Sequence, residues 1–244
     1  MLSAMKSGNE IDGVLLVDKA TGMTSHDVVA ITRRALNTKK VGHCGTLDPL
    51  ATGLLLITIG RGTKIQDLLM SEDKEYVGTL ELGKVTNSQD ADGAVIETNP
   101  VPELSREAID AAFAKFHGDF YQTPPMVSAI KKDGVPLYKL ARQGKEVERE
   151  PRFVHVYAHE IQAVRLPEID FRVVCSKGFY VRTYVHDIGR ELGCGAHLKS
   201  LRRTKSGRFD VDGAITVPEL KAGPLDAVAA RVMTLPAVSR LRGA

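Results

Sequence analysis

Little in this sequence marks it for a membrane, for secretion or for binding nucleic acid through bulk charge. The 33 Lys and Arg residues nearly balance the 30 Asp and Glu residues, so only a local cluster of charge could identify a nucleic-acid surface. No apolar run approaches the roughly 18 residues of a membrane span, and the first residues contain no apolar signal segment. Cys44, Cys175 and Cys194 form no C-x-x-C pair, which fits free thiols in a reducing cytoplasm. We therefore expect a cytoplasmic protein.

The motifs that bind phosphate groups or metal ions are also missing. No G-x-x-x-x-G-K-[ST] phosphate loop exists, and Ile65 occupies the third glycine position of a dinucleotide motif. The acidic turn at residues 87–93 does not complete a calcium loop. His155 and His159 are expected on one face of a strand, but no cysteine or carboxylate completes a known zinc spacing. These absences predict a protein without a cofactor and without a metal.

Residues 40–60 form the stretch around which the rest of the chain can be organised. The glycines at positions 42 and 45 predict a tight turn, because glycine readily adopts a positive φ. Asp48 directly precedes Pro49, which favours an extended or turn backbone at Asp48. Residues 53–59 are apolar and of strand length. We interpret Asp48 as a carboxylate on a stiff loop supported by a buried strand, although Asp-Pro also commonly opens surface turns.

The remaining pattern indicates a mixed α+β fold, in one large or two small domains over 244 residues. Apolar spacing predicts helices at 24–36, 105–117 and 181–192. Alternating or short apolar runs predict strands at 13–17, 75–82, 153–164 and 170–176. A strand end and a short helix are expected at 214–220, and nothing beyond Leu235 is strongly patterned.

Several residues fit either a structural or a functional role. The basic group of Arg33, Arg34, Lys39 and Lys40 suits a solvated helix end as well as a contact with RNA. Seven Lys or Arg residues lie between positions 131 and 152, in a segment that could be a charged surface loop or a protruding insertion. Arg182 is expected in the first turn of a helix, where a cation needs an anionic partner, but a purely structural arginine explains the pattern equally well.

Five separate motifs resemble the bacterial tRNA pseudouridine-55 synthases of the TruB family. The longest is G-H-x-G-T-L-D-P-x-A-x-G at 42–53, and the others lie at 13–25, 74–76, 175–184 and 197–207. The resemblance covers about residues 11–220. Two positions depart from the family pattern: Ala20 stands where proline is usual, and Tyr184 stands where an aliphatic residue is commoner.

The resemblance implies a fold and a domain plan. The fold is expected to be a mixed, mainly antiparallel sheet flanked by helices, as in other pseudouridine synthases. A catalytic domain is expected at 1–235, with a thumb-like, RNA-clamping insertion at about 124–152. Residues 236–244 are expected to be a short tail in place of the small C-terminal RNA-binding domain that bacterial members usually carry.

The resemblance also implies an activity, which is the isomerisation of uridine to pseudouridine in the T-loop of tRNA, at position 55 of the tRNA. The reaction uses base flipping and no cofactor. In the family the aspartate at Asp48 is essential, and the arginine at Arg182 pairs with it. The tyrosine at Tyr76 stacks on the target base, where a plain cross-strand aromatic is the alternative. The catalytic residues are therefore expected to be Asp48, Tyr76 and Arg182.

The expected substrate contacts extend this set. His43 would support the RNA arm, while Tyr180 and Leu201 would close the base pocket. Lys19, Lys64 and Lys131 are expected to contact the RNA. The partner is expected to be the T-arm of tRNA. The protein is expected to be a monomer that does not bind a membrane. Two alternatives stay open: a non-catalytic RNA chaperone on the same scaffold, and a related synthase that acts on another RNA.

Overall fold

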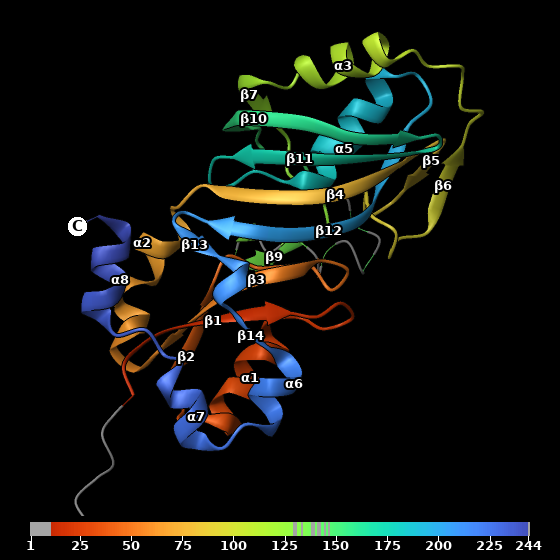
Figure 1. The fold of residues 1–244 in the computed structure, drawn as a ribbon. Coiled ribbons are helices and arrows are strands. Elements are labelled where there is room, and N and C mark those ends of the chain that lie inside the picture. The colour runs from red at the N-terminus through yellow and green to blue at the C-terminus, as the bar shows by residue number, and fades with distance from the viewer. Residues whose placement is uncertain are drawn as a thin grey trace, which may run out of the picture. The chain divides into compact units, whose positions relative to one another are not determined.

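The computed structural model describes residues 11–128, 131–132, 134–137, 140, 143, 145 and 147–243. Two compact units divide the chain (Figure 1). The first unit takes residues from both ends of the chain, up to Glu72 and from Arg203 onward, and the second unit comprises Asp73–Arg202. Strand β12 (Ala196–Ser206) contributes its last residues to the first unit and the rest to the second.

The first unit is built on strands that follow one another in the order β14, β1, β3 and the end of β12, with β2 paired to β3 and β13 paired to β12. Strands β1 and β3 are antiparallel, whereas β1 and β14 are parallel. The elements are β1 (Gly13–Lys19), α1 (Ser25–Ala35), β2 (Val41–Cys44), β3 (Thr52–Ile59), a 3-10 helix (Gly60–Ile65), α2 (Gln66–Met70), β13 (Phe209–Asp210), a second 3-10 helix (Val211–Gly213), β14 (Ile215–Thr216), α6 (Val217–Ala222), α7 (Leu225–Ala230) and α8 (Leu235–Arg242).

Local sequence explains how α1 begins. Thr24 accepts a hydrogen bond from the backbone of Asp27, and the Asp27 carboxylate accepts one from the backbone of Thr24. This reciprocal capping box satisfies backbone donors that the first turn of a helix leaves open. The helix predicted at 24–36 is therefore confirmed as α1. It begins at Ser25, directly after its cap residue Thr24.

Two expectations for the first unit differ from the structure. Residues 42–44 were expected in a tight turn, but they belong to strand β2, which pairs with β3 from Val41 to Cys44. Of the two glycines, Gly45 has a positive φ of +76° and Gly42 does not, whereas a Cβ at Gly42 would lie 2.5 Å from the end of the Gln66 side chain. No pattern was expected beyond Leu235, but Leu235–Arg242 form helix α8, and Val238 is buried in the core.

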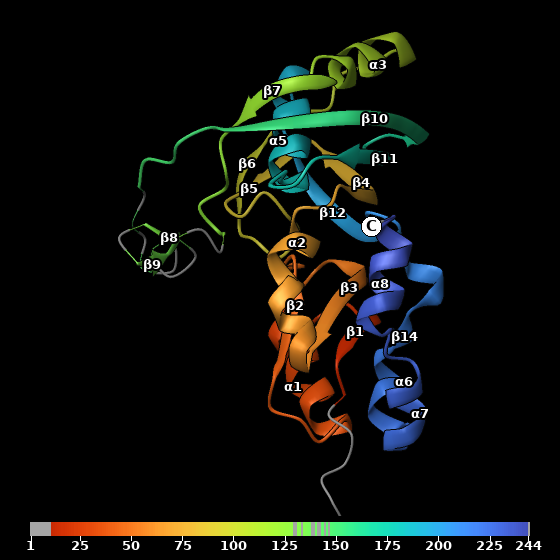
Figure 2. The same ribbon diagram turned by 90° about the vertical axis from the view of Figure 1, so that its left-hand side faces the viewer.

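The second unit is an antiparallel sheet in the order β12, β4, β11, β10 and β7. Helices α3 and α5 pack on it through Phe113, Tyr184 and Phe171, whose rings are 5.9–6.2 Å apart (Figures 1 and 2). The elements are β4 (Lys74–Leu82), β5 (Lys84–Thr86), β6 (Val95–Thr98), α3 (Arg106–Ala114), β7 (Gly118–Gln122), β8 (Lys131–Lys132), β9 (Val135–Pro136), β10 (Arg152–Arg165), β11 (Glu168–Cys175) and α5 (Val181–Glu191).

The expected fold class is confirmed, because both units combine a mainly antiparallel sheet with helices. The expected insertion leaves the sheet between β7 and β10 and contains the short hairpin of β8 and β9. Residues 129, 130, 133, 138, 139, 141, 142, 144 and 146 of this segment lie outside the described residues. Within the described part of the chain, every helix is too short or too polar to cross a membrane.

Candidate active site

Asp48 lies in the first unit, on the loop that joins β2 to β3. Its side chain is partly exposed, and the neighbouring Leu47 is buried. The buried Ser25 hydroxyl at the start of α1 accepts from the Leu47 backbone N–H at 2.9 Å and donates to the Leu47 carbonyl at 3.1 Å. On the other side of Asp48, the Gly22 N–H donates to the Pro49 carbonyl at 2.9 Å. The loop is thus fixed on both sides of the carboxylate.

Lys19, expected to contact RNA, is instead part of this support. Its side chain is 0% exposed. The ammonium group donates to the carbonyls of Ala20 at 2.9 Å, Met23 at 2.8 Å and Pro49 at 3.4 Å. Lys19 therefore holds the residues before α1 and the Asp48 loop together from inside the protein.

His43, at the end of β2, lies against His26 from α1. The two rings meet edge to face with centroids 5.2 Å apart. Burial, His26 and Arg203 together lower the pKa of His43 to about 4, from the usual 6.5. The His43 Nδ1 atom is buried without a hydrogen-bond partner among the described residues. His43 is thus a neutral ring at ordinary pH, with one open ring nitrogen.

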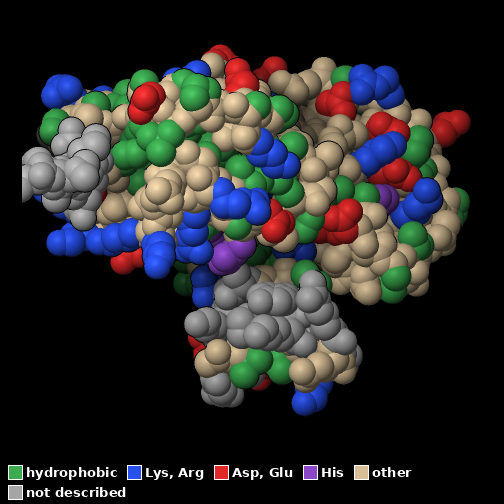
Figure 3. Space-filling view, turned by 90° about the horizontal axis from the view of Figure 1, so that it is seen from below, with side chains coloured by type: hydrophobic (Ala, Val, Ile, Leu, Met, Phe, Trp, Pro, Cys, Tyr) green, Lys and Arg blue, Asp and Glu red, His purple; other side chains and the backbone are tan. Residues whose placement is uncertain are grey.

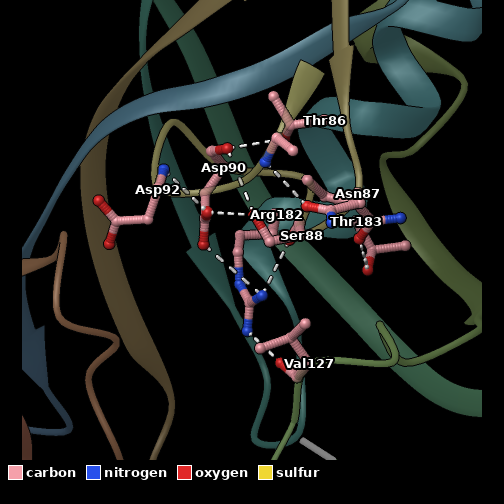
Figure 4. Close-up of polar contacts among 10 residues, drawn as sticks. Thr86, Asn87, Ser88, Asp90, Asp92, Val127, Arg182 and Thr183 are labelled. Atoms are coloured by element: carbon pink, nitrogen blue, oxygen red, sulfur yellow. Dashed lines mark hydrogen bonds and ion pairs between the residues drawn. The ribbon is translucent and has the colours of Figure 1, made fainter. Parts of the chain in front are cut away.

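Arg182 is the centre of a polar cluster in the second unit (Figure 4). It sits in the first turn of α5 and is only 4% exposed. Its guanidinium group donates to the carbonyl of Ser88 at 2.9 Å and to the carbonyl of Val127 at 2.7 Å. The Asp90 carboxylate lies 3.6 Å from Nη1 and is equally buried. Asp90 is thus one anionic partner of Arg182 in the second unit.

The turn that carries Asp90 is itself tightly bonded. Asp90 Oδ1 accepts hydrogen bonds from the Ser88 hydroxyl and, at 3.2 Å, from the backbone N–H of Asp92. The Thr86 hydroxyl donates to the Asp90 carbonyl at 2.6 Å. Thr183, next to Arg182 on α5, donates to the Gln89 side chain at 3.0 Å. This turn was predicted only as an acidic turn, and nothing in its sequence distinguished Asp90 from its acidic neighbours.

Tyr76 and Leu201 lie on neighbouring strands of the second unit. Tyr76 is opposite Val173 in the pairing of β4 with β11, and both are buried. Two residues further along β4, Gly78 makes room for β12, because a Cβ there would lie 2.8 Å from the Ser200 carbonyl and 3.3 Å from Leu201. The missing side chain at Gly78 therefore allows Leu201 to approach the strand that carries Tyr76.

Tyr180 immediately precedes α5, and its backbone is fixed by Gln122 at the end of β7. The Gln122 amide donates to the Tyr180 carbonyl at 3.1 Å, and its oxygen accepts from the Tyr180 N–H at 2.7 Å. Gln122 is buried, so this pair of bonds is shielded from water. Sequence reasoning missed Gln122, whose only signal was a polar residue at the end of an otherwise ordinary strand.

The remaining predicted contacts are less defined. Lys64 is exposed at the end of the 3-10 helix that follows β3. Lys131 begins β8, and its side chain lies outside what the structure describes. Arg33, Arg34, Lys39 and Lys40 are all exposed after or within the last turn of α1. Figure 3 shows lysine and arginine side chains gathered on the face of the molecule that is seen from below.

The structure therefore groups the predicted residues in two sets. Asp48, His43 and Lys19 lie in the first unit, whereas Tyr76, Tyr180, Arg182 and Leu201 lie in the second. The pair of Asp48 with Arg182 would join one residue from each unit, and it stays a prediction. No cluster of three or more His, Cys, Asp or Glu residues that could hold a metal occurs among the described residues.

Comparison with known proteins identifies the family. A family model described as "TruB family pseudouridylate synthase (N terminal domain)" matches residues 33–181. A second model, described as "tRNA pseudouridylate synthase B C-terminal domain", matches residues 182–236, from α5 to the start of α8. The chain belongs to the TruB family of pseudouridylate synthases.

Relatives and solved structures agree with this assignment. The tRNA pseudouridine synthase B of Opitutus terrae is 59% identical over 92% of this chain and 93% of its own length. That of Syntrophotalea carbinolica is 50% identical over 86% of this chain and 69% of its own length. A crystal structure of a Cbf5-Nop10-Gar1 complex contains a chain that is 29% identical, with a TM-score of 0.72 over 95% of this chain and 62% of that chain. These similarities support an RNA-modifying isomerase.

Proposed function

We propose that this protein isomerises uridine to pseudouridine in the T-loop of tRNA, at position 55 of the tRNA. The membership of the TruB family, with curated relatives named tRNA pseudouridine synthase B, is the observation that carries this proposal. Pseudouridine formation breaks the N1–C1′ bond, turns the uracil and joins C5 to C1′. It changes no oxidation state, so it requires no redox cofactor.

The substrate uridine must first leave the folded RNA arm. Flipping a base out of its stack costs a few kcal/mol, which contacts with the extruded base and the phosphates must offset. Tyr76 stacks on the flipped uracil, and Tyr180 and Leu201 close the pocket around it. The ring of His43, neutral and next to His26, supports the RNA arm from the other unit.

Asp48 performs the chemistry in this proposal. It acts as the nucleophile or as the base that abstracts a ribose proton, and either role requires a carboxylate that is ionised and held in one place. The hydrogen bonds from Ser25 to Leu47 and from Gly22 and Lys19 to Pro49 supply the fixed geometry. Arg182 pairs with Asp48 and favours its charged form. Tyr76 assists in removing the C5 proton at the end.

Basic residues bind the phosphates. The exposed cations at the end of α1, with Lys64, form the surface for RNA in the first unit, and Lys131 contributes from the insertion. Because RNA binding releases counterions, the affinity should fall as salt rises. We call the four cations within and after the last turn of α1 the basic edge: Arg33, Arg34, Lys39 and Lys40.

The decisive experiment replaces Asp48 by Asn. Tritium release from a T-arm minihelix that contains 5-tritiated uridine measures C5–H exchange directly. The variant should release no tritium above background, while its Kd for the minihelix stays within about threefold of the wild type, because the amide keeps the size of the carboxylate. Residual turnover in the variant would remove Asp48 from its role.

The same assay separates the two alternatives. An RNA chaperone without catalysis predicts no tritium release by the wild-type protein, although it binds the minihelix. A synthase for another RNA predicts release from ribosomal RNA fragments and none from the minihelix. Side-by-side reactions on both RNAs therefore decide between all three functions.

We further infer that the protein works as a cytoplasmic monomer that uses no metal. Cys44, Cys175 and Cys194 are free and buried, which suits a reducing compartment. Size-exclusion chromatography with light scattering should give the mass of one chain, 26.5 kDa. Dialysis against EDTA should leave tritium release unchanged.

A further inference from the structure

The loop that carries Asp48 begins and ends at glycines with positive φ. Gly45 has a φ of +76°, and Gly53 has a φ of +96°. Such angles are costly for residues with a side chain, so both positions depend on glycine. The sequence alone gave no reason why two such positions should lie on either side of Asp48. The structure shows that one residue, Arg203 on β12, contacts both.

The side chain of Arg203 holds the first end of the loop. Its Nη2 donates to the Gly45 carbonyl at 3.1 Å, and its Nε donates to the Leu54 carbonyl on β3 at 2.7 Å. One planar guanidinium group thus links the residue where the loop starts to the strand where it finishes. A Cβ at Gly45 would lie 3.3 Å from Nη1 and would press on this group.

The backbone of Arg203 holds the second end. A Cβ at Gly53 would lie 2.3 Å from the Arg203 carbonyl oxygen and 2.8 Å from its backbone nitrogen. No side chain fits in that space, so the β3 backbone can approach β12 this closely only through glycine. Gly45 and Gly53 therefore have a common explanation, which is contact with Arg203 from two directions.

Arg203 is also an unusual buried charge. It is 1% exposed and is the largest fully buried side chain of the described residues. Its two hydrogen-bond partners are neutral carbonyls, and no carboxylate pairs with it in the described part of the chain. Burying a cation without an anion is costly, so a hydrophobic residue would suit a purely structural position better. The charge also contributes to the low pKa of His43.

From these contacts we propose that Arg203 is a positioning residue for the reaction, which fixes both ends of the Asp48 loop and places a buried positive charge beside it. It touches neither substrate nor reacting atoms and acts through Asp48. This inference rests on the proposed function for its kinetic consequence, whereas its structural consequence can be measured without catalysis. The predicted effect is on the rate of the chemical step and on the order of the loop.

The test compares Arg203→Met, Arg203→Lys and Lys205→Met. Lys205 lies on the same strand but is exposed, so its variant controls for the loss of a cation from β12. Single-turnover tritium release, the Kd for the T-arm minihelix and the melting temperature are measured for each. Amide hydrogen exchange of Leu47 and Ala51, whose N–H groups bond to Ser25 and to the Asp48 carbonyl, reports the order of the loop.

Arg203→Met should lower the single-turnover rate by about 100-fold, because small displacements of a catalytic group have effects of this size. The Kd should stay within about threefold of the wild type, and exchange at Leu47 and Ala51 should become faster. Arg203→Lys should restore part of the rate, since lysine keeps the charge but cannot reproduce the planar fork. A wild-type rate per folded molecule in Arg203→Met, or unchanged exchange, would overturn the proposal.

Gly45→Ala provides a second route if Arg203→Met does not fold. It leaves Arg203 in place but forces a Cβ against the guanidinium group from the loop side. The same loss of rate with retained RNA binding is expected, and an unchanged rate would contradict the role of the contact. If the wild type and Lys205→Met release no tritium, the proposed function fails, while the exchange measurements still decide whether Arg203 orders the loop.

Discussion

The two units of the molecule hold their buried cations in different ways. In the first unit, Lys19 and Arg203 are held by neutral backbone carbonyls of the Asp48 loop and its neighbours. In the second unit, Arg182 is held by two carbonyls and by the buried carboxylate of Asp90. In the first unit, Lys19 and Arg203 hold the Asp48 loop in place. In the second unit, the turn that contains Ser88 and Asp90 holds Arg182 in place.

This difference has a physical consequence. A buried charge that bonds only to carbonyls keeps most of its field, whereas a charge beside a carboxylate is largely compensated. Arg203, which pairs with no carboxylate among the described residues, therefore keeps its positive charge next to the Asp48 loop. In the second unit, the Asp90 carboxylate offsets part of the Arg182 charge. Four substitutions or pH changes test this difference between the two units.

The largest effect is expected from Asp90→Ala. Removing one partner of a buried ion pair typically costs about 3–5 kcal/mol, and here Arg182 would lose the buried carboxylate that lies beside it. Equilibrium urea unfolding should show a loss of stability of about 3 kcal/mol. Asp92→Ala, in the same turn but exposed, is the matched control and should cost little. Equal losses in the two variants would mean that the Arg182–Asp90 pair is not the main support of this turn.

Lys19→Met should have the next largest effect, and it acts on the first unit only. Methionine fills a similar volume but leaves the carbonyls of Ala20 and Met23 without their donor, at a cost of about 2 kcal/mol. Urea unfolding measures the loss, with the exposed Lys221→Met on α6 as control. A variant as stable as the wild type would show that these carbonyls find other donors.

The pH dependence of stability tests the shielding of His43. Its pKa is lowered to about 4 in the folded protein from 6.5, so the unfolded chain binds a proton first as the pH falls. Stability is fully present above pH 6.5 and is lost as the pH falls toward 4, by roughly 2 kcal/mol after allowance for solvent screening. Burial is the main cause, followed by His26 and Arg203.

The measurement compares urea unfolding of the wild type and His43→Gln at pH 7 and pH 4.5. Glutamine does not titrate, so the variant should lose less stability than the wild type over this range. Other histidines with lowered pKa values, His159 and His186, are present in both proteins and cancel in the difference. Parallel losses in the two proteins would show that His43 is open to water.

The smallest effect is expected at the basic edge. Lys39→Gln with Lys40→Gln should reduce the slope of log Kd against log salt by about 1 to 2, since each phosphate contact on RNA contributes roughly 0.7–0.9. Filter binding of the T-arm minihelix between 50 and 300 mM salt, roughly the range where such slopes are resolved, measures it. An unchanged slope would leave these lysines as an ordinary solvated helix end, and Lys221→Gln is the control.

Elements with strong local patterns could be predicted from the sequence. Apolar spacing placed the helices at 24–36 and 181–192 close to the observed α1 and α5. The turn predicted at Gly42 was wrong, because residues 41–44 form strand β2. Pairing of β2 with β3, a tertiary contact, overrode the turn preference of the two glycines. The alternating pattern of residues 153–164 predicted His155 and His159 on one face of the strand. The pairing of β10 with β11 shifts register between Val156 and Ala158, so the two histidines do not keep a simple alternation.

The supports of the site were less predictable than its central residues. Asp48 and Arg182 stood in long motifs, whereas Asp90, Gln122 and Arg203 are ordinary polar residues whose importance lies in what they bond to. Their partners are distant in sequence: Arg203 bonds to Gly45 and Gln122 bonds to Tyr180. Spacing along one chain carries no information on such contacts, because they exist only once the strands have paired.

The first unit takes residues from both ends of the chain, and this fixes the order of events during synthesis. A ribosome that has made the Asp48 loop has not yet made Arg203, nor the β14 strand that pairs with β1, nor Met233, which bonds to Val14. The second unit is complete earlier and can fold while the rest is still being translated. A nascent chain therefore carries the aspartate long before it can hold it in place, and the loop becomes ordered only after Arg203 and β14 have been made.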